Sequence, residues 1–208
     1  MLVKDFAGTG TVAQVLACYN NGVSYPIAMR DELAEVIPSL RSRFPRYADY
    51  ARATMADLLT PAEREGAIEK RAFTFATSVV HNNGDGSFTV TPLPDEAQLA
   101  PVYGILAEDL DHDGHVDLLL AGNFEGFRPE IGRMASSEGL FLRGGSGGRF
   151  TPLPPRVSGF RVAGQARDIA TLRTGQGRRI VVARNNDRPL IFRTTGAPRP
   201  LATSARPR

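Results

Sequence analysis

The chain has 208 residues, of which 42% are hydrophobic and 23% are charged, and its formal net charge at pH 7 is +3. This composition is that of a globular protein with a core and excludes an intrinsically disordered chain. The sequence has no apolar run long enough for a transmembrane segment, and the single Cys18 excludes an intramolecular disulfide.

The N-terminal part of the chain predicts short strands around a glycine-containing loop. Asp5 opens this loop, and the apolar segment 14–21 after it predicts a strand that ends in two asparagines. We expect the segment 26–71 to be helical. Apolar residues recur there at helical spacing behind Asp31, a candidate N-cap, and Pro38 predicts a kink.

A second helix start lies near the end of this segment. Thr60 and Glu63 have the spacing of a capping box, and Pro61 occupies the first helical position between them. This pattern predicts a helix that runs to about Lys70 or Arg71. Two glycine-rich turns further on, at 83–88 and 145–150, each precede a short strand and predict β-hairpins.

The most informative stretch of the sequence is an acidic loop at 109–117. Its carboxylates stand at positions 1, 3, 5 and 9 of the loop: Asp109, Asp111, Asp113 and Asp117. Gly114 lies among them and is expected to permit a sharp turn. Carboxylates this close repel one another, whereas calcium takes about six to eight oxygen ligands and would neutralise them. His115, at position 7, would contribute its backbone carbonyl oxygen. The loop therefore predicts a calcium site, with a simple Asp-rich turn as the alternative.

The sequence after this loop excludes an EF-hand. An EF-hand requires a bidentate glutamate at position 12, and here that position is Leu120. The segment 117–123 is a short apolar run that ends in glycine and asparagine, which favours a buried strand. We therefore expect the calcium site in a loop between two strands.

Internal repetition predicts the architecture. The segments 14–21, 117–123 and 179–186 share an apolar strand that ends in asparagine, and an aspartate precedes each of them: Asp5, Asp109 and Asp168. The two later aspartates are 59 residues apart, and the phenylalanines of the two glycine hairpins are 62 residues apart. Repeats of this size in a sequence of short strands indicate the blades of a β-propeller.

The C-terminal part of the chain is basic. Residues 156–208 contain twelve arginines and two aspartates, whereas residues 1–155 carry a net charge of −7. An anion-binding or nucleic-acid-binding module is therefore an alternative function, although only Phe160 and Phe192 could stack on bases there. Residues 194–208 contain three prolines and are expected to form a disordered basic tail.

The segment 109–123 resembles the FG-GAP or VCBS repeat, the blade unit of integrin alpha-subunit propellers. The family's loop pattern Asp-x-Asp-x-Asp-Gly-x-x-Asp-Leu is met at every position. With the segments 24–26, 82–88, 101–105 and 129–133, residues 2–193 also resemble the C-terminal part of bacterial VCBS-repeat proteins akin to cartilage acidic protein. The resemblance implies a mainly β fold, a partial β-propeller of two to three four-stranded blades with a helical insertion in the first blade.

The resemblance also implies domain boundaries. Residues 1–193 would form C-terminal blades of a propeller, with the insertion at about 26–71, the calcium blade at about 101–155 and the last blade at about 160–193. The first and third repeats depart from the loop pattern. Asp168 is not followed by the loop pattern. The first loop has neither a carboxylate nor an amide at three of the ligand positions: Ala7, Thr9 and Ala13. We therefore expect a single calcium site.

The function implied by the resemblance is a non-catalytic scaffold, at the cell surface or outside the cell, that binds a surface protein or a glycan. Glu130 and Arg133 are candidate ligand-binding residues in the loop 123–133, which could equally be a salt-bridged structural loop. So few blades would leave apolar surface and strand edges exposed, so we expect either missing upstream blades or self-association.

An enzyme is the remaining alternative, since propellers also form segments of extracellular hydrolases and lyases. The sequence has only three histidines, and it contains no nucleophile elbow, zinc-binding helix or phosphate-binding loop. We therefore assign no catalytic residue.

Overall fold

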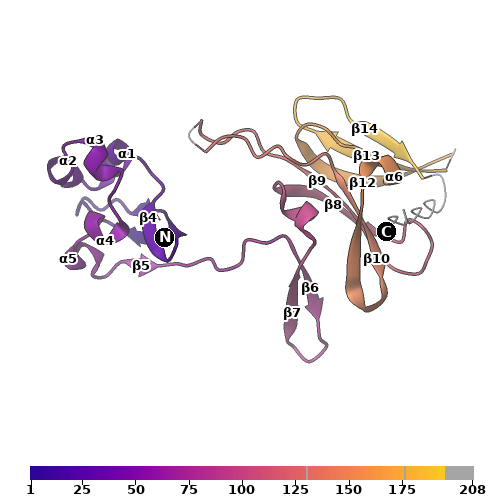
Figure 1. Ribbon diagram of the computed structural model, residues 1–208, viewed down its shortest axis with the longest axis horizontal. Helices are drawn as coiled ribbons and strands as arrows, with labels where there is room; N and C mark the ends of the chain where they lie inside the picture. The colour runs from indigo at the N-terminus through magenta and orange to yellow at the C-terminus, as the bar shows by residue number, and fades with distance from the viewer. Residues whose placement is uncertain (130, 176, 195–208) are drawn as a thin grey trace, which may run out of the picture. The chain divides into compact units, whose positions relative to one another are not determined.

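A computed structural model describes residues 1–129, 131–175 and 177–194 (Figure 1). Strands hold 38% of the residues and helices 18%, so the expected mainly β fold is confirmed. The sheets are antiparallel and none of them closes on itself. The chain divides into two compact units, residues 1–75 and residues 76–208. Every helix that the structure describes is too short or too polar to cross a membrane.

Unit 1 contains a small sheet and a separate hairpin. The sheet has the order β2-β1-β5, and β3 and β4 form the hairpin: β1 Leu2–Lys4, β2 Ala13–Val15, β3 Ala17–Asn20, β4 Val23–Pro26 and β5 Ile68–Glu69. The expected single strand at 14–21 is therefore two strands. They part at Leu16, whose carbonyl oxygen accepts a hydrogen bond from the Ile27 amide at 3.0 Å.

Five short helices of unit 1 lie between the two halves of its sheet in sequence: α1 Arg30–Val36, α2 Leu40–Arg43, α3 Tyr47–Tyr50, α4 Met55–Leu58 and α5 Pro61–Arg64. Apolar side chains of α1 to α4 form a core with strand β2, in which Leu40 and Leu58 are almost fully buried, whereas α5 has no buried residue. The N-cap of α1 is Met29, so the expected cap at Asp31 is wrong, and the helix ends before Pro38 instead of bending there.

The second helix start was predicted correctly but its length was not. Thr60 and Glu63 form the capping box, with proline at the first helical position. Helix α5 nevertheless ends at Arg64 instead of reaching Lys70. Gly66 adopts a left-handed conformation with φ of 72°, and the chain then pairs with β1 as strand β5.

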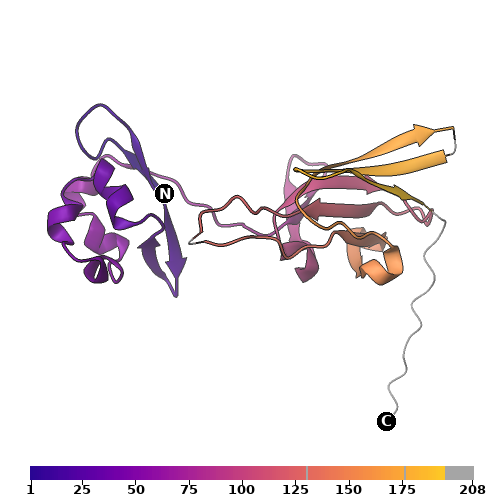
Figure 2. The same cartoon turned by 90° about the horizontal axis from the view of Figure 1, so that it is seen from above.

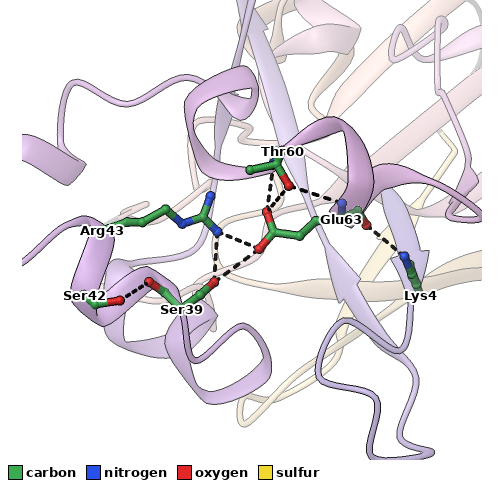
Figure 3. A network of polar contacts seen from close by, with 6 residues as sticks. All are labelled: Lys4, Ser39, Ser42, Arg43, Thr60 and Glu63. Atoms are coloured by element: carbon green, nitrogen blue, oxygen red, sulfur yellow. Dashed lines mark hydrogen bonds and ion pairs between the residues drawn. The ribbon is translucent and has the colours of Figure 1, made fainter.

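Glu63 is the centre of a polar network that joins α5 to α2 and to β1 (Figure 3). Its Oε2 accepts hydrogen bonds from the Thr60 amide at 2.8 Å and the Thr60 hydroxyl at 3.0 Å. Its Oε1 lies 2.8 Å from Arg43 Nη2, and Lys4 Nζ donates to its backbone oxygen at 3.1 Å. Burial opposes ionisation of Glu63, but the bonds from Thr60 and the charge of Arg43 outweigh it and lower its pKa.

Replacing Glu63 by alanine should reduce the free energy of unfolding by about 1.5 kcal/mol near neutral pH, because it removes a helix cap and a partly exposed ion pair. The lowered pKa of Glu63 means that its contribution is present above the unfolded-state pKa of 4.5 and is lost as the pH falls through the folded-state value. Urea unfolding near pH 7 and near pH 3 measures both effects. Glu65→Ala is the matched control, and a loss that is the same at both pH values would contradict the assignment.

Unit 2 contains a hairpin, a four-stranded sheet and a three-stranded sheet (Figure 1). The hairpin and the short helix after it are β6 Ser78–Asn82, β7 Phe88–Pro92 and η1 Asp95–Gln98. The four-stranded sheet follows chain order and includes a short turn helix: β8 Val102–Glu108, β9 Asp117–Gly122, β10 Leu140–Gly145, η2 Ser146–Gly148 and β11 Arg149–Leu153. Helix α6 precedes the last sheet: α6 Pro155–Ser158, β12 Ala166–Thr174, β13 Gly177–Arg184 and β14 Leu190–Arg193.

Both predicted glycine hairpins are present, since Asn82 pairs with Phe88 and Gly145 pairs with Arg149. The expectation of two to three four-stranded sheets is not met by the described residues. In that part of the chain one sheet has four strands, and the others have two or three. The expected basic tail lies outside the described residues from residue 195 onward.

Strand β9 is buried because the four-stranded sheet is covered on both faces. On one face Leu119 and Ala121 pack with residues of β12 and β13, so that the two sheets form adjacent layers (Figure 2). On the other face Leu120 packs with Leu142 and with Leu93, which follows the β6–β7 hairpin. Because both faces of β9 are covered, its sequence is a continuous apolar run at 118–121 instead of an alternation of apolar and polar residues.

The two neighbouring sheets of unit 2 repeat one geometry. The pairing of β8 with β9 has a bulge at Tyr103, and the pairing of β12 with β13 has a bulge at Arg167, 64 positions later. Asp168 therefore corresponds to Gly104, inside a strand, and its expected match with Asp109 at a strand end is wrong. A Cβ atom at Gly104 would lie 2.9 Å from the Asp168 carbonyl carbon, so glycine permits the close approach of β8 and β12.

Candidate metal site

The acidic loop connects β8 to β9, and the pairing of Glu108 with Asp117 closes it. Asp109 organises the loop backbone. Its Oδ1 accepts a hydrogen bond from the Asp113 amide at 3.2 Å, and its Oδ2 accepts one from the Gly114 amide at 3.1 Å. The turn uses left-handed residues at two positions, His112 with φ of 62° and Gly114 with φ of 88°. The predicted role of Gly114 in the sharp turn is thus confirmed.

Three of the predicted ligands converge. Asp109, Asp111 and Asp117 each offer a carboxylate oxygen, and these oxygens lie within 4.8 Å of one another. Asp111 is 8% exposed and Asp117 is fully buried. Burial of several carboxylates at such separations is costly without a compensating positive charge, so the arrangement is one that a cation would stabilise.

Asp117 also fixes the loop to the sheet. Its Oδ2 accepts a hydrogen bond from the Leu110 amide at 2.9 Å, and its Oδ1 accepts one from the Gly144 amide of β10 at 2.8 Å. Burial raises the pKa of Asp117 above its ordinary value, although these two hydrogen bonds oppose the shift and nearby Asp111 adds to it. Gly144 must be glycine here, since a Cβ atom would lie 2.1 Å from the Val116 carbonyl oxygen.

The fourth predicted carboxylate, Asp113, is not part of the convergent group. Its Oδ2 lies 3.1 Å from Arg143 Nη2, and its Oδ1 accepts a hydrogen bond from the His115 amide at 2.9 Å. Arg143 Nε also lies 2.7 Å from Asp111 Oδ2. Sequence reasoning missed Arg143 because it lies on β10, well outside the loop motif, and no spacing rule links it to the loop.

Of the two candidate ligand-binding residues, the structure describes only Arg133. Arg133 lies in the connection between β9 and β10, where its exposed guanidinium is 3.6 Å from Glu125 Oε2. Glu130 lies outside the described residues. The contact of Arg133 accords with the salt-bridged loop that the sequence left open.

The loop at Asp5 is a geometric copy of the acidic loop. Lys4 pairs with Ala13 across the base of this loop, and Glu108 pairs with Asp117 across the base of the acidic loop. Both residues of the second pair lie 104 positions after those of the first. Asp5 accepts hydrogen bonds from the Thr9 amide at 3.1 Å and from the Gly10 amide at 2.6 Å, and the Gly10 bond is the main reason why its pKa is lowered. Among the residues that the structure describes, acidic and other potential ligands converge at the later loop and not here.

A second group of polar and aromatic residues lies at the opposite ends of the same strands. The Arg167 guanidinium lies 4.5 Å from the centroid of the Tyr103 ring, which is about half exposed, and its Nη1 donates to the Asn123 carbonyl at 2.9 Å. The buried Asn123 side chain donates to the carbonyls of Ser137 at 2.7 Å and Gly164 at 2.9 Å. Asn123, which directly follows β9, therefore joins the connections of two sheets.

The donor set of the acidic loop consists of oxygens alone. Carboxylate oxygens suit hard cations such as calcium and magnesium, and they are poor ligands for soft metals. Comparison of the chain with known proteins gives no match to a family model, to a curated protein or to a solved structure. The chemical assignment of the site therefore depends on its residues and geometry.

Proposed function

We propose that the chain is a calcium-stabilised repeat module of a β-propeller, and that it acts as a non-catalytic scaffold binding a protein or glycan at the cell surface or outside the cell. The observation that carries the proposal is the convergence of Asp109, Asp111 and Asp117 in a loop between antiparallel strands. The match of this loop to the FG-GAP or VCBS pattern supports calcium as the cation.

The arrangement of unit 2 supports the propeller. A propeller blade is a four-stranded antiparallel sheet in chain order, and successive blades pack face to face. Strands β8 to β11 have this order, and their sheet packs on the β12–β14 sheet through a shared apolar core. The bulges at Tyr103 and Arg167 recur at equivalent positions, as expected of repeated blades.

Exposed apolar side chains support the proposed partners. The β6–β7 hairpin exposes Val80, Phe88 and Val90, each more than half accessible to solvent. A two-stranded ribbon of this kind has little stability alone and leaves strand edges free. Upstream blades or a second copy of the chain would cover this surface, and a ligand would bind the completed face.

Calcium in this proposal has a structural role. Extracellular calcium modules bind with dissociation constants of roughly 10⁻⁴ to 10⁻³ M. About tenfold excess calcium would then stabilise the fold by about 1.4 kcal/mol through mass action. That contribution is a substantial part of the stability of a small unit.

Adding roughly 10 mM calcium should therefore raise the melting temperature by about 3 °C or more, and a chelator should reverse the rise. The double variant Asp111→Ala plus Asp113→Ala should lose this response, because it removes one convergent ligand and the adjacent loop carboxylate. Asp95→Ala plus Glu96→Ala, at two exposed positions of the short helix η1, is the charge-matched control. A calcium response that persists in the loop variant would refute the site.

A further inference from the structure

We propose that Arg143 is a built-in competitor of the cation: its guanidinium occupies the acidic loop when calcium is absent and must be displaced, or repelled, when calcium binds. This inference rests on the proposed calcium site and concerns how that site is regulated. It assigns to a residue of β10, outside the loop motif, control over the affinity of the loop.

The contacts of Arg143 place it between two carboxylates of the loop. Its Nε lies 2.7 Å from Asp111 Oδ2, and its Nη2 lies 3.1 Å from Asp113 Oδ2. Asp111 Oδ2 is closed to solvent and accepts no well-aligned hydrogen bond from the described residues, so the guanidinium charge is its compensation. The positive charge of Arg143 therefore neutralises the loop carboxylates in part, as a bound cation would.

Charge repulsion makes the two cations exclusive. An ion held by Asp109, Asp111 and Asp117 would share the Asp111 carboxylate with Arg143, only a few ångströms from the guanidinium. Like charges at such distances repel strongly in a partly buried site. Asp113, moreover, is held by Arg143 outside the group of converging carboxylates. Release of Arg143 would free Asp113 to complete the predicted set of ligands.

The exchange requires only a side-chain movement. The Arg143 side chain is 44% exposed, so it can turn from the loop into solvent. The neighbouring Gly144 amide holds Asp117 through the backbone and does not depend on the arginine. Strand β10 can therefore keep its place while the guanidinium leaves, and the calcium-free loop stays partly neutralised and folded.

Replacing Arg143 by glutamine tests this role. Isothermal titration with calcium chloride should give a dissociation constant about fivefold to tenfold lower than in the unchanged protein, because the competing charge is gone. Without calcium, the variant should melt at a lower temperature, since Asp111 loses its compensating charge. The rise in melting temperature on calcium addition should accordingly be larger in Arg143→Gln.

Arg161→Gln is the matched control, because Arg161 is an exposed arginine of the same unit that pairs with Glu138 at 2.7 Å, away from the loop. It should leave calcium affinity within about twofold of the unchanged protein. If Arg143→Gln does not fold, the NMR signal of the Arg143 Nε–H in the unchanged protein is followed instead, with and without calcium. That signal should be protected from exchange without calcium and lose its protection when calcium is added.

The outcomes separate this inference from the proposed function. Equal calcium affinities in the unchanged protein and in Arg143→Gln would overturn the competitor role and leave the site standing. Weaker binding in the variant would show that Arg143 positions the ligands, which also overturns it. Absence of calcium binding in both proteins would refute the site itself and the inference with it. Tighter binding confined to Arg143→Gln supports both.

Discussion

Replacing Gly122 by alanine should destabilise unit 2 by about 3 kcal/mol or more, a large effect for a single methyl group. A Cβ atom at this position would lie 1.7 Å from the Pro101 carbonyl oxygen and 3.0 Å from the Val102 Cα atom. Both neighbours are backbone atoms, so no side-chain rotation relieves the overlap. Strand β9 would have to move away from the start of β8, where the Asn123 amide donates to Pro101 at 3.0 Å.

Gly145→Ala is the matched control for this change. Gly145 is also a strand glycine of the same sheet, but its backbone is extended and the nearest atom to a built Cβ is the Arg149 oxygen at 3.8 Å. The free energy of unfolding of Gly145→Ala should stay within about 0.5 kcal/mol of that of the unchanged protein. Urea unfolding followed by far-ultraviolet circular dichroism compares the two variants. Equal stabilities would show that β8 and β9 are less closely apposed than the structure has them.

The second large effect is expected at Asp117. Asp117→Ala removes the acceptor of two buried amides, Leu110 and Gly144, and should lower the free energy of unfolding by about 3 kcal/mol. Part of the cost is offset because a buried carboxylate is also removed, so the net loss is smaller than two full desolvation penalties. Asp117→Asn keeps one acceptor oxygen, so its free energy of unfolding should lie between those of the unchanged protein and of Asp117→Ala.

Hydrogen exchange identifies the cause of this loss. The Leu110 and Gly144 amides should be protected in the unchanged protein and should exchange faster in Asp117→Ala, even without calcium. Asp85→Ala, which removes an exposed turn carboxylate that accepts from the Ser87 amide at 2.9 Å, is the control. An Asp117→Ala variant that retains full stability and protected amides would contradict the role assigned to this carboxylate.

Local sequence signals predicted the parts of the molecule that depend on neighbouring residues. The loop 109–117, its turn at Gly114 and the capping box at Thr60 are each set by contacts within a few positions, and the structure has all three. The convergence of Asp109, Asp111 and Asp117 follows from the same loop. Short-range chemistry of this kind can be read from one sequence because its partners stand in one motif.

The sequence did not predict features that depend on distant pairing. Arg143 reaches the loop only because β10 lies beside β9. The match of Asp168 with Asp109 followed similar residue patterns, whereas the true correspondence follows a bulge in the strand register. Helix α5 is shorter than its pattern because residues 68 and 69 are used in pairing with β1. In each case tertiary pairing overrides a local preference.

The loop at Asp5 bears on how acidic loops of this shape can arise and disappear during evolution. Its backbone bonds are formed by a single carboxylate, and its register is that of the acidic loop. The shape of the hairpin connection is therefore separable from its charge. Carboxylates could accumulate or disappear one substitution at a time on a loop that remains folded throughout.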